Sequence, residues 1–375
     1  MVLFFAVPMG NRSERRRRAN RRFILHTTNA ILTLQPDAMR GARTHGAEEH
    51  MDISYDTLKG GAKLFGVDLD TLGLLGGVDG TAYAYTQAGR QYVLKFAPVP
   101  GERVPGLRAK LDFASYLGAN GVSVARPRAS ASGALVETLP FPGPRGQVYA
   151  VTASERAMGR NAFEAREWND ELFTQWGRLI GQMHRLTKSY DEVRPWPDGL
   201  IGDWEGEHYS FAHSCEDEAV RARWFALADV LRSYTTDRDS YGLVHNDPHP
   251  FNFTVSREQG ALRLTLFDFD VCLYHWFMTD IGIALFHALW AQRIDGHSAE
   301  VFAARFMERF ARGYEAENRL DGTWWQRLPV FVKYRQILLY MVFSHEWEQP
   351  NADQARQLRD WHNSIVNDFP VVNMN

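Results

Sequence analysis

The chain has 375 residues, of which 45% are hydrophobic and 13% aromatic, so it is long enough to bury more than one core. Its two cysteines, Cys215 and Cys272, are too few and too far apart for a disulfide framework or a zinc pattern, and they suit a reducing cytoplasm. The formal net charge is −3 and no apolar run reaches the length of a membrane span, so neither a nucleic-acid partner nor a membrane is expected.

Residues 1–50 differ in composition from the rest of the chain. They contain nine arginines against four acids, whereas the remaining residues carry a net negative charge. A short apolar stretch precedes the arginines, which reverses the order found in a secretory signal peptide. We interpret residues 1–50 as a basic, disordered N-terminal extension, with Met39 and Met51 as alternative start positions. A nucleic-acid or surface-binding tail and an organellar presequence are the other interpretations.

A glycine-bearing segment and a lysine on a strand come next, in the order that an ATP site requires. The loop contains Gly76, Gly77 and Gly80, and a predicted hairpin over 82–96 follows it, with Lys95 on the second strand. Glycines let the backbone approach phosphate oxygens closely, and the lysine ammonium would meet them as a point charge. Taken alone this pattern is also that of an ordinary hairpin, and its position ahead of the motifs below gives it weight.

The rest of the chain divides into a part rich in strands and a helical part. Further strands are predicted over 135–139 and 147–152, on either side of a turn rich in proline and glycine. After Gly159 apolar residues recur at spacings of three and four, which indicates helices. The predicted helices cover residues 168–186, 218–234, 280–292, 299–315 and 331–343. The sequence therefore predicts an α+β protein with one domain over residues 51–155 and a mostly helical one over 156–375.

The most informative motif lies in the second half of the chain. His245, Asp247 and Asn252 have the spacing of the kinase catalytic loop, and Asp268 follows a predicted hairpin with its turn at 258–260. Phosphoryl transfer needs a carboxylate to take the acceptor's proton, and an amide oxygen with a second carboxylate to hold magnesium. The joint spacing of Asp247, Asn252 and Asp268 supplies these groups, whereas a lone His-x-Asp would be weak.

With these motifs the chain resembles the aminoglycoside phosphotransferase and choline kinase-like family, small-molecule relatives of the protein kinases. The likeness rests on four passages: 76–95, 155–159, 176–186 and 245–280. It implies a protein-kinase-like fold with two lobes, a small β-rich N-lobe and a larger, mostly helical C-lobe. It also implies a cytoplasmic enzyme that uses ATP and Mg²⁺ and moves the γ-phosphoryl group to a hydroxyl of a small molecule.

The resemblance implies a role for each matching residue of the catalytic loop. Asp247 would be the catalytic base, and Asn252 and Asp268 would be the magnesium ligands. His245 would orient the loop, and Asp280 resembles the buried aspartate that binds the loop backbone in this family.

The resemblance also implies a nucleotide site between the lobes. Gly76, Gly77 and Gly80 would cover the phosphates, Lys95 would contact the α- and β-phosphates, and backbone groups around Glu155 and Ala157 would meet adenine.

Two departures from the family pattern occur. The family carries a glutamate that pairs with the strand lysine, but Lys110 stands at that position, which leaves Asp112 and Glu102 as candidate partners for Lys95. The segment Phe267–Asp270 has no glycine, so we expect no activation-loop switch. Asp270 is either a second carboxylate of the site or a solvated acid at the end of a strand.

Acceptor contacts are expected from the helical lobe. The candidates are Asp203, Trp204, Glu205, His249, Tyr274, His275, Trp276, Arg335, Glu346 and Trp347. Most of the aromatic residues in this set have the spacing of core residues. Two alternatives to small-molecule phosphorylation stay open: a protein Ser/Thr kinase of the bacterial stress-response type, and a nucleotide-binding regulator without turnover.

Overall fold

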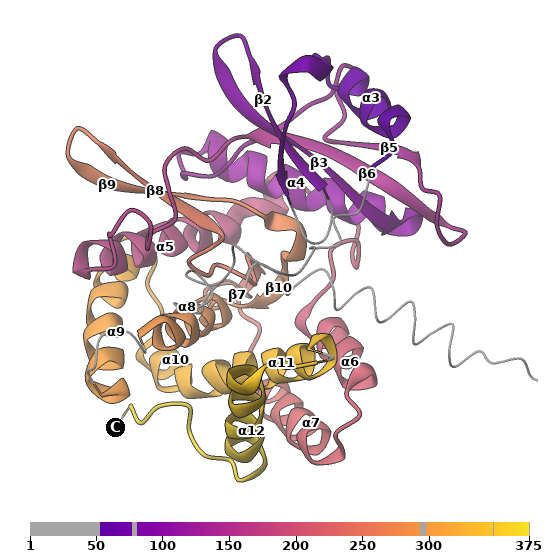
Figure 1. Cartoon of the computed structure of the whole chain (residues 1–375). Coiled ribbons are helices and arrows are strands. Elements are labelled where there is room, and N and C mark those ends of the chain that lie inside the picture. The colour runs from indigo at the N-terminus through magenta and orange to yellow at the C-terminus, as the bar shows by residue number, and fades with distance from the viewer. Residues whose placement is uncertain (1–52, 77–80, 293–297, 348, 375) are drawn as a thin grey trace, which may run out of the picture.

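Two lobes make up the computed structural model, which describes residues 53–76, 81–292, 298–347 and 349–374. The small lobe lies at the top of Figure 1 and the helical lobe below it. The α+β fold class and the two-lobed architecture predicted from the sequence are confirmed. The expected basic extension, together with Gly77 and Gly80, lies outside the described residues.

An antiparallel sheet forms the small lobe, with strand order β1-β2-β3-β6-β4 and β5 also paired to β6. Its elements are α3 (Tyr55–Leu64), β1 (Gly73–Gly76), β2 (Thr81–Gln87), β3 (Arg90–Pro100), α4 (Val104–Ala119), β4 (Pro127–Arg128), β5 (Val136–Pro140) and β6 (Gln147–Glu155). Successive side chains of a strand point to opposite faces. Leu94 and Phe96 are therefore buried together in the core of this lobe, and Lys95 between them points to the other face.

Helices build most of the large lobe. They are α5 (Asp170–Val193), α6 (Trp204–Ser214), α7 (Glu218–Arg232), α8 (Met278–Ala291), α9 (Ala299–Glu315), α10 (Gly322–Gln326), α11 (Leu328–Glu346) and α12 (Ala352–Val366). Two pairs of short antiparallel strands lie in the upper part of this lobe (Figure 1). They are β7 (Tyr241–Val244) with β10 (Leu273–Trp276), and β8 (Phe253–Glu258) with β9 (Ala261–Leu266).

Helices α5 and α9 pack closely against each other, and α5 supports the catalytic loop. A Cβ atom at Gly177 would lie 2.0 Å from the Phe310 carbonyl oxygen, and one at Gly313 would lie 1.9 Å from the Thr174 carbonyl oxygen. Both glycines are needed because the two helix backbones touch at these points. Trp176, one residue from Gly177, is fully buried, and its Nε1 donates to the Pro248 carbonyl at 3.1 Å, so α5 supports the loop directly.

The predicted helices and strands all occur, with ends that differ by a few residues. The largest difference is at α5, which continues to Val193, beyond the predicted end at residue 186. Helices α3, α6, α10 and α12 were not predicted. Among the described residues no helix is long and apolar enough to cross a bilayer.

Candidate active site

Asp280 holds the backbone of the catalytic loop. Its Oδ2 accepts from the His245 amide at 3.0 Å and its Oδ1 from the Asn246 amide at 2.8 Å. The carboxylate is fully buried in the first turn of α8, and His184 of α5 lies 3.1 Å from it through Nε2. Asn246 adopts a left-handed conformation with φ 65°, which turns the chain toward Asp247. The predicted contact between Asp280 and the loop backbone is confirmed.

His245 connects the loop to the strand that precedes Asp268. Its Nε2 donates to the Phe267 carbonyl at 3.0 Å, and its Nδ1 accepts from the Asp247 amide at 3.3 Å. These two bonds require the neutral ring with a proton on Nε2. Burial favours that form because it lowers the pKa of His245. The predicted orienting role of His245 is therefore confirmed.

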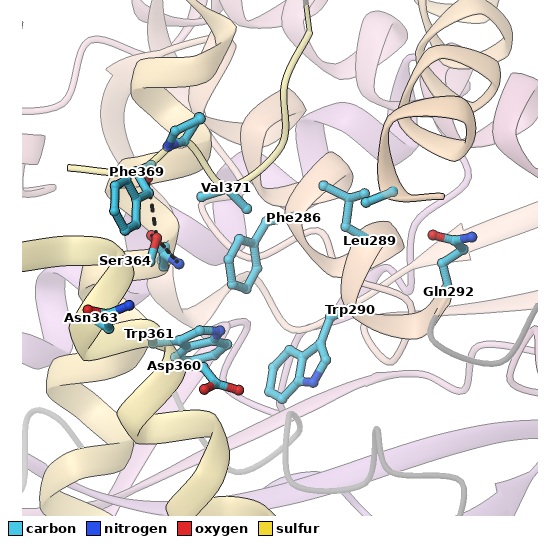
Figure 2. Close-up of a pocket in the computed structure, with 13 residues that line it drawn as sticks. Phe286, Leu289, Trp290, Gln292, Asp360, Trp361, Asn363, Ser364, Phe369 and Val371 are labelled. Carbon is cyan, nitrogen blue, oxygen red and sulfur yellow. Dashed lines mark hydrogen bonds between the residues drawn. The ribbon is translucent and has the colours of Figure 1, made fainter. Parts of the chain in front are cut away.

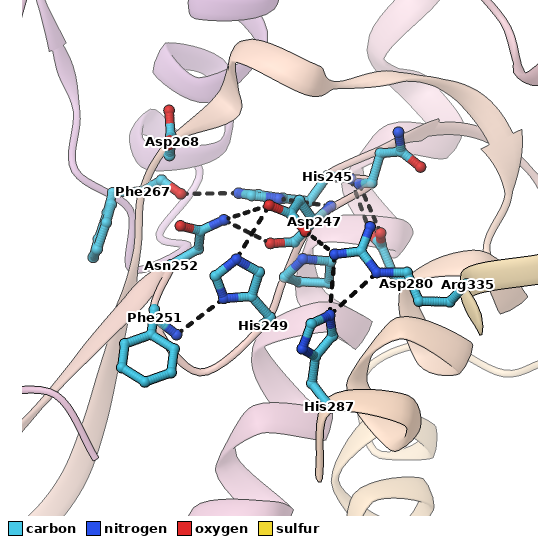
Figure 3. Close-up of polar contacts among 12 residues, drawn as sticks. His245, Asp247, His249, Phe251, Asn252, Phe267, Asp268, Asp280, His287 and Arg335 are labelled. Atoms are coloured by element: carbon cyan, nitrogen blue, oxygen red, sulfur yellow. Dashed lines mark hydrogen bonds and ion pairs between the residues drawn. The ribbon is translucent and has the colours of Figure 1, made fainter. Parts of the chain in front are cut away.

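Asp247 is buried, with 5% of its surface exposed, and is surrounded by donors (Figure 3). Asn252 Nδ2 donates to Oδ2 at 3.0 Å, and His249 Nε2 lies 3.2 Å from the same oxygen. Arg335 of α11 donates to Oδ1 through Nη2. Burial alone would raise the pKa of Asp247, but the charges of His249 and Arg335 hold it below its ordinary value. The side chain is thus kept as an ionised acceptor.

The β8–β9 hairpin brings Asn252 and Asp268 together. Phe253 pairs with Leu266, and the Phe267 amide extends the ladder by donating to the Asn252 carbonyl at 2.9 Å. Because Asn252 Nδ2 is bound to Asp247, its amide oxygen points away from that carboxylate (Figure 3). Asp268 then turns out of the strand in a left-handed conformation with φ 66°.

Lys95 crosses from the small lobe to the aspartates of this segment. Its Nζ lies 3.1 Å from Asp268 Oδ1 and 2.7 Å from Asp270 Oδ2. Asp270 is therefore a second carboxylate at this site, which was one of the two expectations, and its partner is Lys95. Lys110 of α4, at the position of the family's glutamate, donates instead to the Asp270 carbonyl at 2.7 Å. Burial lowers the pKa of Lys110.

Neither candidate partner for Lys95 is needed to explain its pairing. Asp112 accepts from Tyr190 Oη at 2.9 Å and lies 3.4 Å from Arg194 Nε. Glu102 is exposed in the short turn that precedes α4. The carboxylates that pair with Lys95 belong to Asp268 and Asp270. The family pattern puts the partner acid on the helix after the lysine strand, so it did not point to them.

The connection between the lobes runs along the end of β6. Glu155 is the last residue of that strand, and its amide donates to the Arg126 carbonyl at 2.8 Å. Ala157, two residues further on, is partly exposed. Gly159 has φ 111°, and a Cβ there would lie 2.1 Å from the Val255 carbonyl oxygen. The connection is therefore pressed against β8, next to the catalytic loop.

Among the residues expected to contact the acceptor, His249 and Arg335 lie next to the Asp247 carboxylate. Most of the others do not. Trp204, His275 and Trp276 are buried in the core of the helical lobe, as their spacing predicted. Other candidates contact side chains or backbone away from Asp247: Asp203 caps α6, Glu205 pairs with Arg232, Tyr274 binds Asp191, and Trp347 stacks on Phe343.

Glu207 is a buried acid of the site that the sequence did not single out. It lies on α6 with 7% of its surface exposed, and its Oε1 accepts from Asn246 Nδ2 at 2.7 Å. Its Oε2 lies 3.4 Å from the Tyr334 hydroxyl. Burial raises the pKa of Glu207 to about 7. Glu207 thereby connects α6 and α11 to the loop. Its partner Asn246 is 39 positions away in the sequence, so no local pattern could have identified Glu207.

A separate cavity of about 640 Å³ opens lower in the helical lobe, between α8, α11 and α12 (Figure 2). Aromatic and polar side chains line it, among them Phe286, Trp290, Gln336, Asp360 and Trp361. None of its lining residues contacts the Asp247 side chain. Helices α8 and α11 contribute residues both to the surroundings of Asp247 and to this cavity. The catalytic loop and the cavity nevertheless lie at different places in the fold.

The residues around Asp268 fit a magnesium ion bound together with a nucleotide. Among the described residues no three His, Cys, Asp or Glu side chains gather so as to hold a metal by themselves. Magnesium in kinases is typically held by one or two protein oxygens together with substrate phosphates. The amide oxygen of Asn252 and the carboxylate of Asp268 are oxygen donors of that kind, and Lys95 lies beside them.

Comparison with known proteins gives consistent matches over most of the chain. A family model described as the phosphotransferase enzyme family matches residues 70–324. An amicoumacin kinase of Bacillus subtilis (strain 168) is 30% identical over 315 residues, which cover 83% of this chain and 91% of that protein.

Solved structures match over a similar extent. The amicoumacin kinase hAmiN in complex with AMP-PNP, Ca²⁺ and Ami has a TM-score of 0.78 at 30% identity, with 86% of this chain and 96% of that chain covered. A microcompartment-associated aminopropanol kinase has a TM-score of 0.64 at 20% identity, covering 84% of this chain and 95% of that one, and shares the fold.

Proposed function

The chain belongs to the phosphotransferase enzyme family, and from this premise we propose that it transfers the γ-phosphoryl group of ATP to a hydroxyl of a small molecule. One observation carries the proposal. Asn252 donates to the base candidate Asp247 at 3.0 Å and its carbonyl accepts from the Phe267 amide at 2.9 Å, which places it beside the next residue, Asp268. Lys95 from the other lobe lies 3.1 Å from Asp268. The chemistry of phosphoryl transfer needs these four groups together.

Each residue has a part in the proposed reaction. Asp247 would accept the proton of the acceptor hydroxyl, and its buried, ionised carboxylate suits this task. Asn252 and Asp268 would hold Mg²⁺, which would neutralise charge on the transferred group. Lys95 would bind the α- and β-phosphates after leaving Asp268. His245 and Asp280 keep the loop in place and touch no reacting atom.

The nucleotide would lie along the connection between the lobes. Backbone groups at Glu155 and Ala157 would bind adenine, and Gly76, with the glycines Gly77 and Gly80 that follow it, would cover the phosphates. Gly76 ends β1 with φ 93°, a conformation that glycine adopts without strain. The cytoplasm, where ATP is present and free buried cysteines such as Cys215 and Cys272 stay reduced, is the compartment that we propose.

Amicoumacin is the first acceptor to test, because a protein that shares 30% identity over most of this chain is an amicoumacin kinase. The purified chain would be incubated with ATP and Mg²⁺ and with amicoumacin, aminopropanol, spectinomycin or a generic protein substrate. ADP release and mass spectrometry of the acceptor would identify the phosphorylated product. The Asp247→Asn variant is the control for contaminating kinases.

Each outcome separates the proposal from its alternatives. Phosphorylation of a small molecule by the wild-type protein and not by Asp247→Asn supports the proposal. Phosphate on the protein substrate alone would favour a protein kinase. Nucleotide binding without transfer to any acceptor would favour a regulator.

A further inference from the structure

Two neighbouring side chains donate hydrogen bonds to the Asp247 carboxylate. A carboxylate offers about four lone-pair positions, two on each oxygen. Asn252 Nδ2 donates to Oδ2 at 3.0 Å, and Arg335 donates to Oδ1 through Nη2. His249 Nε2 lies 3.2 Å from Oδ2 but makes no hydrogen bond to it. Each oxygen therefore keeps a position for an acceptor hydroxyl, and the position on Oδ1 lies next to the guanidinium.

Arg335 is itself fixed by a neighbour on another helix. Its Nε and Nη2 lie 3.1 and 3.0 Å from His287 Nε2, so one ring nitrogen receives two donors of the planar guanidinium (Figure 3). The ring must be neutral to accept these bonds. Burial, followed by the charge of Arg335, holds the pKa of His287 well below its ordinary value. Arg335 and His287 are both buried, with 2% and 0% of their surface exposed.

A contribution to stability does not explain why a charged pair occupies this place. A buried ion pair is weak evidence for stability, because desolvation of two charges offsets most of their attraction. A planar guanidinium held between Asp247 and His287 does fix the orientation of the carboxylate, because its donors have a rigid geometry. The contact also joins the loop to α8 and α11, the two helices that carry His287 and Arg335.

We infer that Arg335 is a positioning residue for the acceptor step, an inference that rests on the function proposed above. Its guanidinium fixes the Asp247 carboxylate, and the open lone pair of Oδ1 beside it receives the acceptor hydroxyl. His287 fixes the guanidinium in turn. The reacting hydroxyl then stands beside Arg335, at an angle set by α8 and α11. Misplacement of a reacting group by about 1 Å lowers rates by about 10²-fold, which sets the size of the expected effect.

The experiment compares the full-length wild-type protein with Arg335→Ala, Arg335→Lys and His287→Phe. Arg305→Ala is the matched control, because Arg305 is exposed and forms a surface ion pair with Asp170 at 2.7 Å. We expect Arg335→Ala to lower kcat about 10²-fold with KM for ATP changed by less than about threefold. Added guanidinium ion should restore much of that kcat, and Arg335→Lys should retain more of it than Arg335→Ala.

His287→Phe keeps a ring of similar size and leaves Arg335 in place, so it tests positioning without removing the ion pair. We expect kcat to fall about tenfold while the melting temperature stays close to that of Arg305→Ala. This variant, with Arg335→Lys, decides the matter if Arg335→Ala does not fold. Normal kcat in His287→Phe and Arg335→Lys, or a loss confined to KM for ATP, would overturn the inference.

Failure of the proposed function can be told apart from failure of this inference. Transfer to amicoumacin by the wild-type protein is measured first, and its absence counts against that acceptor. Magnesium-dependent ATP hydrolysis then becomes the readout for the same variants, because water takes the acceptor's place beside Asp247. Hydrolysis that is equal in wild-type, Arg335→Ala and His287→Phe would contradict the positioning role.

Discussion

Glu207→Gln should change how the stability of the protein depends on pH. The pKa of Glu207 is raised from an ordinary value of 4.5 to about 7 by burial in the folded protein. Between these values the folded chain binds a proton that the unfolded chain does not, so the free energy of unfolding falls as pH rises. The contribution is fully present below about pH 4.5 and is lost as pH rises through about 7.

The size of the effect follows from the two pKa values. From pH 5 to pH 8 the wild-type protein should lose about 2 to 3 kcal/mol of unfolding free energy through Glu207, since each pKa unit corresponds to about 1.4 kcal/mol. Glutamine keeps the shape and the oxygen that accepts from Asn246 Nδ2. It has no proton to lose, so this part of the pH dependence should vanish in the variant.

Urea unfolding of both proteins at pH 5 and pH 8, followed by tryptophan fluorescence, measures the difference. We expect Glu207→Gln to gain about 2 to 3 kcal/mol relative to the wild-type protein between these pH values. A constant difference between the two proteins across this range would refute the assignment of a raised pKa to Glu207.

Three further predictions concern the site and the connection between the lobes. Asp247→Asn should lower kcat by about 10² to 10⁴, the range for a lost general base, with ATP affinity nearly unchanged by calorimetry; normal turnover would remove Asp247 as the base. Asp268→Ala should abolish the magnesium dependence of AMP-PNP binding, and a titration that still shows this dependence would exclude Asp268 as a ligand. Gly159→Ala should destabilise the protein by about 1 to 3 kcal/mol, because its Cβ would lie 2.1 Å from the Val255 carbonyl oxygen at φ 111°. A denaturation midpoint equal to that of the wild-type protein would contradict the close approach of β8.

Local patterns were enough to predict most of the elements and the loop. The glycine and turn signals around Lys95 placed it on the second strand of a hairpin, and β2 and β3 form that hairpin. The spacing from His245 to Asn252 defines a loop whose internal contacts are short in sequence. Asp280 could be linked to that loop by resemblance to a known family.

Contacts made by residues far apart in the chain could not be predicted. Arg335 meets Asp247 across 88 positions, and periodicity on α11 marks it only as a residue of a buried helix. Lys110 stands where an acid was expected, and only the three-dimensional arrangement shows that Asp270 takes over the pairing with Lys95. A single sequence specifies which faces of helices are apolar, and it leaves open which polar side chains of two packed helices will meet.

The ion pair between Lys95 and Asp268 links the two lobes of the molecule. It is half open to water, with 27% and 41% of the two side chains exposed, so dissolved ions weaken it. In the proposed function, an arriving nucleotide would bring anionic oxygens for the ammonium, and the cation bound with it would pair with the aspartate. Each charge would thus exchange one counterpart for another, and neither would be left uncompensated.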